Sequence, residues 1–345
     1  MLLGKKGMSK IPLLVVSCDR YADLWAPFFT LFWKRWPDCP YPVYLGTNFK
    51  TYPDERVTTI RIADDFSWSS GVRRMLERLG AEYVILFLED FLIRRRVNTP
   101  KIERLVRIAQ QRQLGCLRLA AQLPLAFAPS HRLKDYPDLG VIAPGETLRV
   151  SAQAAIWRTE TLERLLIPCM SAWEFEEIGT QMSEFMPDLF WATYEPAIVY
   201  DQAVEKGKWK PGDLRICQAA GVEVDLGARA VFSHEELCNH YRASESRYRS
   251  YEAKRKAISH FRAGGRLTGL RYSLQFLRQY PLSAQAWAVL LFGLLGSSGI
   301  TWLQRQYVRL KVARVGRRQL EKMAVAQGRN PQADVSGLRY PEPGE

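Results

Sequence analysis

The sequence YVILFLED, residues 83–90, decides the fold class of this chain. Residues 83–88 are all apolar and do not alternate with polar residues, which is typical of a strand buried on both faces of a parallel sheet. Glu89 and Asp90 follow directly, and ligands of α/β proteins bind at the carboxyl ends of such strands. A carboxylate there can hold a divalent metal, which in turn can hold a diphosphate. The alternative is that the two carboxylates only begin a solvated loop.

Strand-like and helix-like patterns alternate around this run, which predicts an α/β fold with a mainly parallel, Rossmann-like sheet and helices on both faces. Further strands are predicted at 11–17, 41–45, 57–62, 116–120, 152–157, 222–226 and 229–232. Helices are predicted at 25–36, from a Ser69 or Ser70 cap to 79, from a Thr99 cap with Pro100 at the first helical position, at 159–166 and at 172–182. The aromatic residues of 25–36 recur at helical spacing and are expected in the core.

Composition excludes several classes of site. The six cysteines are scattered, without a CxxC pair, which argues against a zinc module or a disulfide scaffold and fits a reducing cytoplasm. There are only four histidines and no GxGxxG, P-loop, HExxH or GxSxG motif, so a His-rich metal site or a Ser-His-Asp triad has little support. The apolar stretch 11–16 is too short for a signal sequence, and we expect residues 1–9 to be a loose leader.

The positive charge lies in the last third of the chain. Residues 242–322 contain 17 Lys and Arg against three Asp and Glu, whereas residues 1–241 are neutral overall. A basic stretch of this kind indicates an anionic partner, either a membrane surface or a nucleic acid, unless it is a solvated helical face. Residues 281–304 within it carry no charge, but Gly296–Gly299 interrupt the apolar run after about ten residues, short of a bilayer span. We expect a buried helical pair or a segment in the membrane interface.

Several stretches together resemble the glycosyltransferases of the GT-A fold, the nucleotide-diphospho-sugar transferases, in a bacterial branch linked to cell-surface polysaccharide synthesis. The resemblance covers about residues 11–235. The stretches that carry it are 15–21 (VVSCDRY), the aromatic helix that ends at 36–38 (WPD), 88–91 (LEDF), 153–158 (QAAIWR) and 173–176 (WEFE). The family's Asp-x-Asp motif is here Leu88-Glu89-Asp90, so the metal is held by Asp90 alone, by Glu89 and Asp90 together, or is not needed.

The resemblance implies a role for several residues. Ser17, Asp19 and Tyr21 would line the nucleotide base and ribose. Asn48, Arg73 and Glu89 would contact the nucleotide, its phosphates or its metal, and Asp90 would bind Mg²⁺ or Mn²⁺ on the diphosphate. The base that takes the proton of the acceptor hydroxyl would be Glu176, with Glu174 as second choice, and the reaction would invert the anomeric carbon.

Other residues keep two interpretations. The basic loop 206–210 either closes over a diphosphate or is a solvated turn, and Arg94–Arg96 either contact phosphate or balance the acidic pair. Trp157 and Trp173 either stack on a sugar or pack in the core. His234 either supplies a metal ligand from late in the sequence or, as we expect, has a structural role.

The resulting prediction is a GT-A-like domain at 10–238, a basic helical tail at 239–322 and disorder at 323–345. The enzyme would transfer a sugar from a nucleotide-diphosphate-sugar to a hydroxyl of a surface glycan or lipid-linked acceptor, at the cytoplasmic face of the membrane. A nucleotidyltransferase is disfavoured because the segment after the first strand, 17–21, lacks glycine. A non-catalytic protein that binds membrane or nucleic acid through its tail is the other alternative, and nucleic acid is the less expected of these partners.

Overall fold

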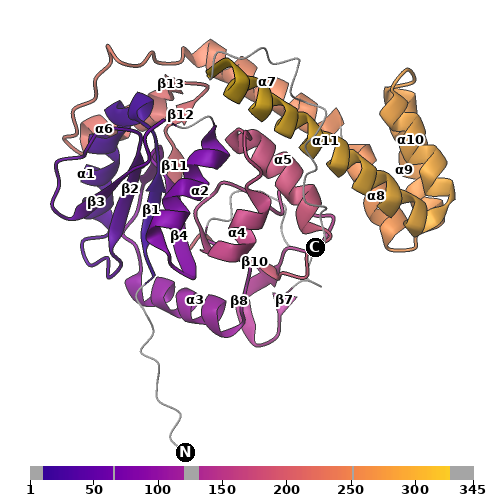
Figure 1. Ribbon diagram of the computed structural model, residues 1–345, viewed down its shortest axis with the longest axis horizontal. Coiled ribbons are helices and arrows are strands. Elements are labelled where there is room, and N and C mark those ends of the chain that lie inside the picture. The colour runs from indigo at the N-terminus through magenta and orange to yellow at the C-terminus, as the bar shows by residue number, and fades with distance from the viewer. Residues whose placement is uncertain (1–10, 65–66, 120–131, 251, 327–345) are drawn as a thin grey trace, which may run out of the picture. The chain divides into compact units, whose positions relative to one another are not determined.

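The computed structural model describes residues 11–64, 67–119, 132–250 and 252–326 (Figure 1). The expectations for residues 1–9 and 327–345 fall outside these ranges. The chain forms two compact units. The first comprises the described residues of Met1–Ile142, Ser151–Ala172 and Pro187–Val231, and the second those of Ala143–Val150, Trp173–Met186 and Phe232–Glu345. The predicted boundary at 238–239 stays a prediction, since the C-terminal helices share their unit with 143–150 and 173–186.

The first unit is built on a nine-stranded sheet, in the order β3-β2-β1-β4-β9-β6-β10-β8-β7. Its strands are β1 (Leu13–Val16), β2 (Val43–Thr47), β3 (Val57–Arg61), β4 (Tyr83–Leu88), β6 (Cys116–Arg118), β7 (Arg132–Leu133), β8 (Tyr136–Val141), β9 (Ala155–Arg158) and β10 (Phe190–Thr193). The ladders β1–β2, β2–β3, β1–β4 and β6–β10 are parallel, and β9 is antiparallel to both β4 and β6. All strands of this sheet except β8 and β9 therefore run in one direction, which confirms the predicted mixed α/β class.

Strand β4 is buried on both faces, as its sequence predicts. Tyr83, Ile85 and Phe87 belong to one hydrophobic cluster, while Val84 and Leu86 are equally buried on the other face of the sheet. That cluster takes in the aromatic side chains of α1 (Trp25–Arg35) and the apolar side chains of α3 (Thr99–Gln111). Helix α2 (Trp68–Leu79) lies against β2 through Met75, whose sulfur occupies the space beside Gly46. The sheet is thus covered on both faces, and the expectation that the α1 aromatics are core is confirmed.

Two helix caps differ from the predictions. Ser67, rather than Ser69 or Ser70, caps α2, because its side-chain oxygen accepts the Ser70 backbone N–H. Ser69 is buried instead, where its hydroxyl donates to the Ile167 carbonyl oxygen. Asn98 caps α3 by accepting the Lys101 N–H, which moves Thr99 from the cap to the first helical position.

The strands predicted at 222–226 and 229–232 are wrong. Within that stretch only Val231 forms a bridge, to Trp209. The Asp225 carboxylate accepts the N–H groups of Gly227 and Ala228, and this local turn takes the backbone donors that a ladder would use.

Small ladders after β4 were not predicted. Strand β5 (Phe91–Ile93) pairs antiparallel with β11 (Tyr200–Gln202), and β12 (Val204–Glu205) forms a hairpin with β13 (Lys208–Trp209). Lys206 and Gly207 both have positive φ in the hairpin turn, a backbone form suited to two-residue hairpins. Helix α6 (Pro211–Ala219) follows, with proline at its first position. The described part of this unit also contains α4 (Thr159–Leu165) and a 3-10 helix, η1 (Asp19–Leu24), which precedes α1.

The second unit is helical. It contains α5 (Ala172–Ser183, from Trp173 onward), α7 (His234–Ser250), α8 (Glu252–Arg262), α9 (Arg266–Gln279), α10 (Ala284–Leu294) and α11 (Gly296–Ala326). Helices α8 to α11 pack together around Ala257, Phe261, Val289 and Ile300. Helix α11 continues through residues 323–326, which are therefore helical rather than disordered.

Helix α10 ends as its sequence predicts. Leu295 closes it, and Gly296 takes a positive φ before α11 begins. None of the described helices combines the length and the apolar character needed to cross a bilayer.

The close approach of α8 and α10 gives the first testable prediction. A Cβ at Gly293 would lie 2.3 Å from the ring of Phe261, which is fully buried and has no room to move. We expect Gly293→Ala to lower the free energy of unfolding by about 1–3 kcal/mol, as overpacking does. Gly212→Ala in α6 is the matched control, because nothing lies within 4 Å of the new methyl group. Urea denaturation checks both, and equal stabilities of the two variants would contradict this packing.

Candidate functional site

The residues after β1, β2 and β4 meet at one edge of the sheet because these strands are parallel neighbours. The chain passes from β1 outward to β2 and β3, and then returns to the other side of β1 to form β4. The strand order therefore reverses between β1 and β4, and the crevice at such a switch point is where open α/β sheets bind ligands. Ser17 follows β1, Asn48 follows β2 and Glu89 follows β4.

Asp19 fastens two of these segments together. Its Oδ1 accepts the Asn48 N–H at 3.0 Å and the Lys50 N–H at 3.2 Å, and its Oδ2 accepts the Phe49 N–H at 3.1 Å. The Asn48 side chain returns the contact by accepting the Asp19 N–H at 3.0 Å. This carboxylate thus already binds three backbone N–H groups, which fixes the loop after β2 at the mouth of the crevice. Sequence reasoning gave Asp19 a nucleotide contact, and the structure gives it this anchoring role.

Ser17 and Arg73 also have structural contacts. The Ser17 hydroxyl accepts a hydrogen bond from the Trp25 indole N–H at 2.8 Å. Arg73 donates to the Glu163 carbonyl oxygen at 2.9 Å, at the carboxyl end of α4. Its guanidinium therefore holds that helix end.

The acidic pair is not a solvated loop. Glu89 is only 9% exposed, and Asp90 is partly exposed beside it. Burial, followed by the charge of Asp90, raises the pKa of Glu89 well above its usual value. Burial likewise raises the pKa of Asp90 to about 7, against the opposing effect of Lys210. Two adjacent carboxyl groups with raised pKa values favour the approach of a cation, which would remove the cost of ionising them both.

Arg229 supplies positive charge next to this pair. Its guanidinium binds Asp23 through two bonds of 2.9 Å, and its carbon lies 4.6 Å from the centre of the Tyr21 ring. The charge of Arg229 opposes the rise in the Glu89 pKa. The pKa of Tyr21 is raised mainly by burial and, as a smaller effect, by the Glu89 carboxylate. Tyr21 thus lies close to both Arg229 and Glu89. Arg229 was missed, since it lies in a stretch wrongly predicted as a strand.

The hairpin β12–β13 brings the basic loop to the same place. Arg229 also donates to the Gly207 carbonyl oxygen at 3.1 Å, which fastens the hairpin turn to the site. The Asp90 carbonyl oxygen accepts the Ala203 N–H at 2.8 Å, and the Ala203 carbonyl oxygen accepts the Lys210 N–H at 2.9 Å. Lys210 is thereby held near Asp90 and acts on its pKa. Loop 206–210 is therefore part of the site rather than a detached solvated turn.

The donor set fits a divalent cation shared with a diphosphate. No group of three or more His, Cys, Asp or Glu residues suited to a metal occurs in the described parts of the chain. Mg²⁺ is commonly held by one or two carboxylates, with waters and substrate phosphates completing its octahedron. Glu89 and Asp90 would supply those carboxylates, and Lys210 and Arg229 would face the phosphates.

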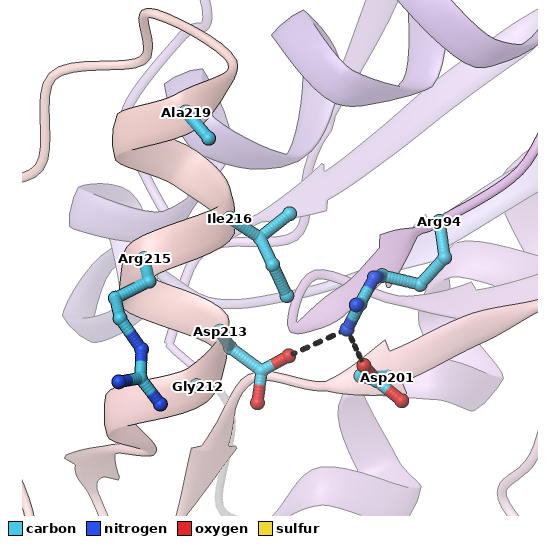
Figure 2. Close-up of a pocket in the computed structure, with 7 residues that line it drawn as sticks. All are labelled: Arg94, Asp201, Gly212, Asp213, Arg215, Ile216 and Ala219. Atoms are coloured by element: carbon cyan, nitrogen blue, oxygen red, sulfur yellow. Dashed lines mark hydrogen bonds and ion pairs between the residues drawn. The ribbon is translucent and has the colours of Figure 1, made fainter.

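Arg94 points away from the acidic pair. It forms ion pairs with Asp201 and Asp213, the latter at 3.8 Å, at the side of a cavity of about 430 Å³ between β11 and α6 (Figure 2). Burial raises the pKa of Asp213 to about 6, while Lys210, 3.8 Å away, opposes the rise. Arg96 lies 3.6 Å from Asp38. These two arginines therefore do not balance Glu89 and Asp90, and Lys210 connects the site with the adjoining cavity.

The predicted bases lie on α5, in the second unit. Glu174 forms an ion pair with Arg318 of α11, and Glu177 accepts a hydrogen bond from the Tyr307 hydroxyl at 3.0 Å. Glu176 projects from α5 between them in sequence and is partly exposed.

Four aromatic or histidine positions differ in their surroundings. Trp157 is fully buried in the sheet, so its core interpretation is confirmed, whereas the Trp173 side chain is exposed. Phe49, which sequence reasoning did not single out, is exposed beside the Asp19 anchor. His234 begins α7 with its Nε2 3.7 Å from the Cys238 sulfur.

The raised pKa of Asp90 predicts a pH dependence of stability. In the folded protein Asp90 keeps a proton up to about pH 7, whereas the unfolded chain releases it near its ordinary value of 3.8. The unfolded state binds fewer protons between these values, so stability falls as pH rises through them. The free energy of unfolding of Asp90→Asn should therefore decline less over this pH interval. At pH 7 it should exceed that of the wild type by on the order of 2 kcal/mol.

Urea denaturation at several pH values between about 4 and about 7 measures this difference. Asp135→Asn, at an exposed turn between β7 and β8, makes the same chemical change and should follow the wild-type curve. Parallel curves for wild type and Asp90→Asn would show that Asp90 is not perturbed.

Comparisons with known proteins give distant structural similarities. No protein-family model and no curated protein matches the sequence. Residues 1–349 of S. aureus TarS, solved in complex with UDP, are 13% identical, cover 93% of this chain and 92% of that chain, and have a TM-score of 0.41. A longer S. aureus TarS structure is 14% identical, over 88% of this chain and 53% of that chain, with a TM-score of 0.37. The bifunctional IspDF of Campylobacter jejuni is 13% identical, over 46% and 43%, with a TM-score of 0.28. At these identities and scores no residue role, ligand or activity passes from these proteins to this chain.

Proposed function

We propose that this protein is a glycosyltransferase that takes a sugar from a nucleotide-diphosphate-sugar. The observation that carries the proposal is the pair of buried Glu89 and partly exposed Asp90 at the switch point of the sheet, next to Lys210 and Arg229. Paired carboxylates and cations at this edge suit a metal-bound diphosphate better than a neutral ligand. The GT-A resemblance of the sequence supports the same assignment.

The site's own residues have distinct tasks in this reaction. The Tyr21 ring and the exposed Phe49 offer faces for the nucleotide base, and the Asp19 anchor keeps the loop after β2 in place beneath it. Lys210 and Arg229 stabilise the negative charge that grows on the diphosphate as the bond to the sugar breaks. Glu89 and Asp90 would hold Mg²⁺ or Mn²⁺, which would supply positive charge to offset part of that leaving-group charge.

Proton transfer from the acceptor needs a carboxylate outside this cluster, since Glu89 and Asp90 would be occupied by the cation. Glu176 on α5 is the proposed base, with Glu174 of the same helix as the second candidate. A carboxylate that removes the acceptor proton during direct attack gives inversion at the anomeric carbon. The acceptor is a hydroxyl of a surface glycan or lipid-linked glycan, and the basic stretch 242–322 attaches the enzyme to the inner membrane face.

Nucleotide binding tests the donor half of the proposal. We expect one of UDP, GDP, CDP, CMP and dTDP to raise the melting temperature, and Mn²⁺ or Mg²⁺ to increase that shift, because a ligand of the native state stabilises it by RT ln(1 + [L]/Kd). Asp90→Asn should lose the metal-dependent part, and Lys210→Ala should weaken the shift by diphosphates more than that by CMP. Asp135→Asn is the control and should behave as the wild type. No shift with any nucleotide, with or without metal, would refute the proposal.

Catalysis is tested separately through Glu176. With the donor that the nucleotide panel identifies, Glu176→Gln should reduce transfer by several orders of magnitude, because the neutral amide cannot take the acceptor proton. The nucleotide-induced shift in melting temperature should stay unchanged. Full activity of Glu176→Gln would remove this residue as the base, and a product of retained anomeric configuration would remove the inverting mechanism.

A further inference from the structure

The outer face of α10 is apolar and exposed. Trp287, Leu291 and Leu294 lie on one stripe of this helix, at positions i, i+4 and i+7, and each is about half-exposed, at 47–55%. Leu295 extends the stripe past the helix end, and Leu282 in the turn before α10 is almost fully exposed. The helix carries no charged residue. An exposed apolar stripe of this length marks an interaction site rather than scattered surface residues.

Packing within the second unit keeps this stripe outward. The opposite face of α10 presents Ala286, Val289 and Gly293, all of which are buried. Gly293 and Gly269 of α9 lie against the ring of Phe261, at distances that leave no space for a side chain. The Trp287 indole N–H is bonded to the Pro281 carbonyl oxygen at 2.9 Å, which fixes the ring over the turn. Rotation of α10 to hide its leucines would therefore break the packing of the unit.

The charge around the stripe points to the chemistry of its partner. Residues 253–320 contain 13 Lys and Arg and not one Asp or Glu. On α9, which packs beside α10, exposed Arg271 and Arg278 alternate with exposed Leu267 and Leu274 along one face. Apolar side chains interspersed with arginines, without any acid, are the pattern of a helix that lies in the headgroup region of an anionic bilayer.

We propose that the α9–α10 hairpin is an interfacial membrane anchor, which rests Trp287, Leu291 and Leu294 in the acyl boundary while Arg271 and Arg278 bind lipid phosphates. This inference rests on the proposed function, since it names the surface by which the transferase reaches a lipid-linked acceptor. Helix α10 has 11 residues, about 16 Å in length, so it lies along the interface and does not span the bilayer.

A second copy of the chain is the competing occupant of this face. In a two-fold dimer the same patch meets itself, so Arg271 and Arg278 of each subunit would approach the arginines of the other. No acidic residue lies within 253–320 to compensate them. An anionic lipid surface supplies that compensation, which is why the lipid is the occupant we favour.

Flotation with vesicles tests the proposal on the full chain without nucleotide. Wild type should float with phosphatidylcholine mixed with phosphatidylglycerol, float much less with phosphatidylcholine alone, and lose binding at high salt. The double variant Leu291→Glu with Leu294→Glu should lower the vesicle-bound to free ratio by more than about tenfold. Each substitution removes the favourable transfer of a leucine side chain from water into the apolar part of the bilayer. Arg271→Gln and Arg278→Gln should each lower it roughly fivefold, the factor that corresponds to about 1 kcal/mol. Leu226→Glu, a matched change at an exposed leucine of the first unit, should float as the wild type.

The outcomes separate this inference from the proposed transferase. If wild type does not float with the anionic vesicles, or the double leucine variant floats as well as wild type, the anchor is refuted. If light scattering shows a wild-type dimer that the double leucine variant converts to monomer, the face belongs to a second copy and the anchor is again refuted. The nucleotide shift of the first unit is measured on the same samples. A chain that floats with anionic vesicles but binds no nucleotide would support the anchor and refute the transferase.

Discussion

Two neighbouring carboxyl groups at the end of a buried strand impose the main constraint on the first unit. β4 carries Glu89 and Asp90 out of the core, and like charges in such a place are costly unless cations or protons accompany them. Arg229 and Lys210 supply positive charge beside this pair. Both come from far along the chain and are held there by contacts with the hairpin β12–β13 and the residues next to it. Their positive charge only partly offsets the burial, so both carboxyl groups keep raised pKa values. The proposed metal-bound diphosphate would relieve that residual imbalance.

The parts of the fold that the sequence predicted well are those set by local apolar pattern. The six apolar residues of β4 and the aromatic spacing of α1 each predict that the segment is buried. This prediction holds whichever part of the chain packs against it. The caps at Ser67 and Asn98 were misplaced by one to three positions because several consecutive residues could all accept the same backbone N–H. For the site, Glu89 and Asp90 were singled out because they directly follow a strand, and Tyr21 because of the family resemblance. Arg229 was not, since nothing in its own neighbourhood indicates a partner such as Asp23 that lies 206 residues away.

The second unit is held together by other interactions than the first. Its helices pack closely where Gly269 and Gly293 contact the Phe261 ring, and α11 forms ion pairs with α5. Because these contacts use few side chains, the rest of the surface can carry both basic and apolar residues. Glu184 shows how the acidic residues of this unit are used. It is bonded to Arg262 of α8 and, at 3.1 Å, to Gln304 of α11, and its pKa is raised by burial despite these partners. Glu184 is thus directed inward, and residues 253–320 contain no acidic residue to offset their positive charge.

The interleaving of the two units has a consequence for biosynthesis. Residues 143–150 and 173–186 leave the ribosome long before the helices with which they share a unit. Until Arg262 and Gln304 have been made, the carboxylate of Glu184 lacks these two partners, and α5 lacks its contacts with Tyr307, Lys311 and Arg318. The N-terminal sheet can collapse early, but α5 can reach its final state only after nearly the whole chain has been translated. The contacts of α5 are therefore completed late, so a prematurely terminated chain would have the sheet but would lack the partners that hold α5.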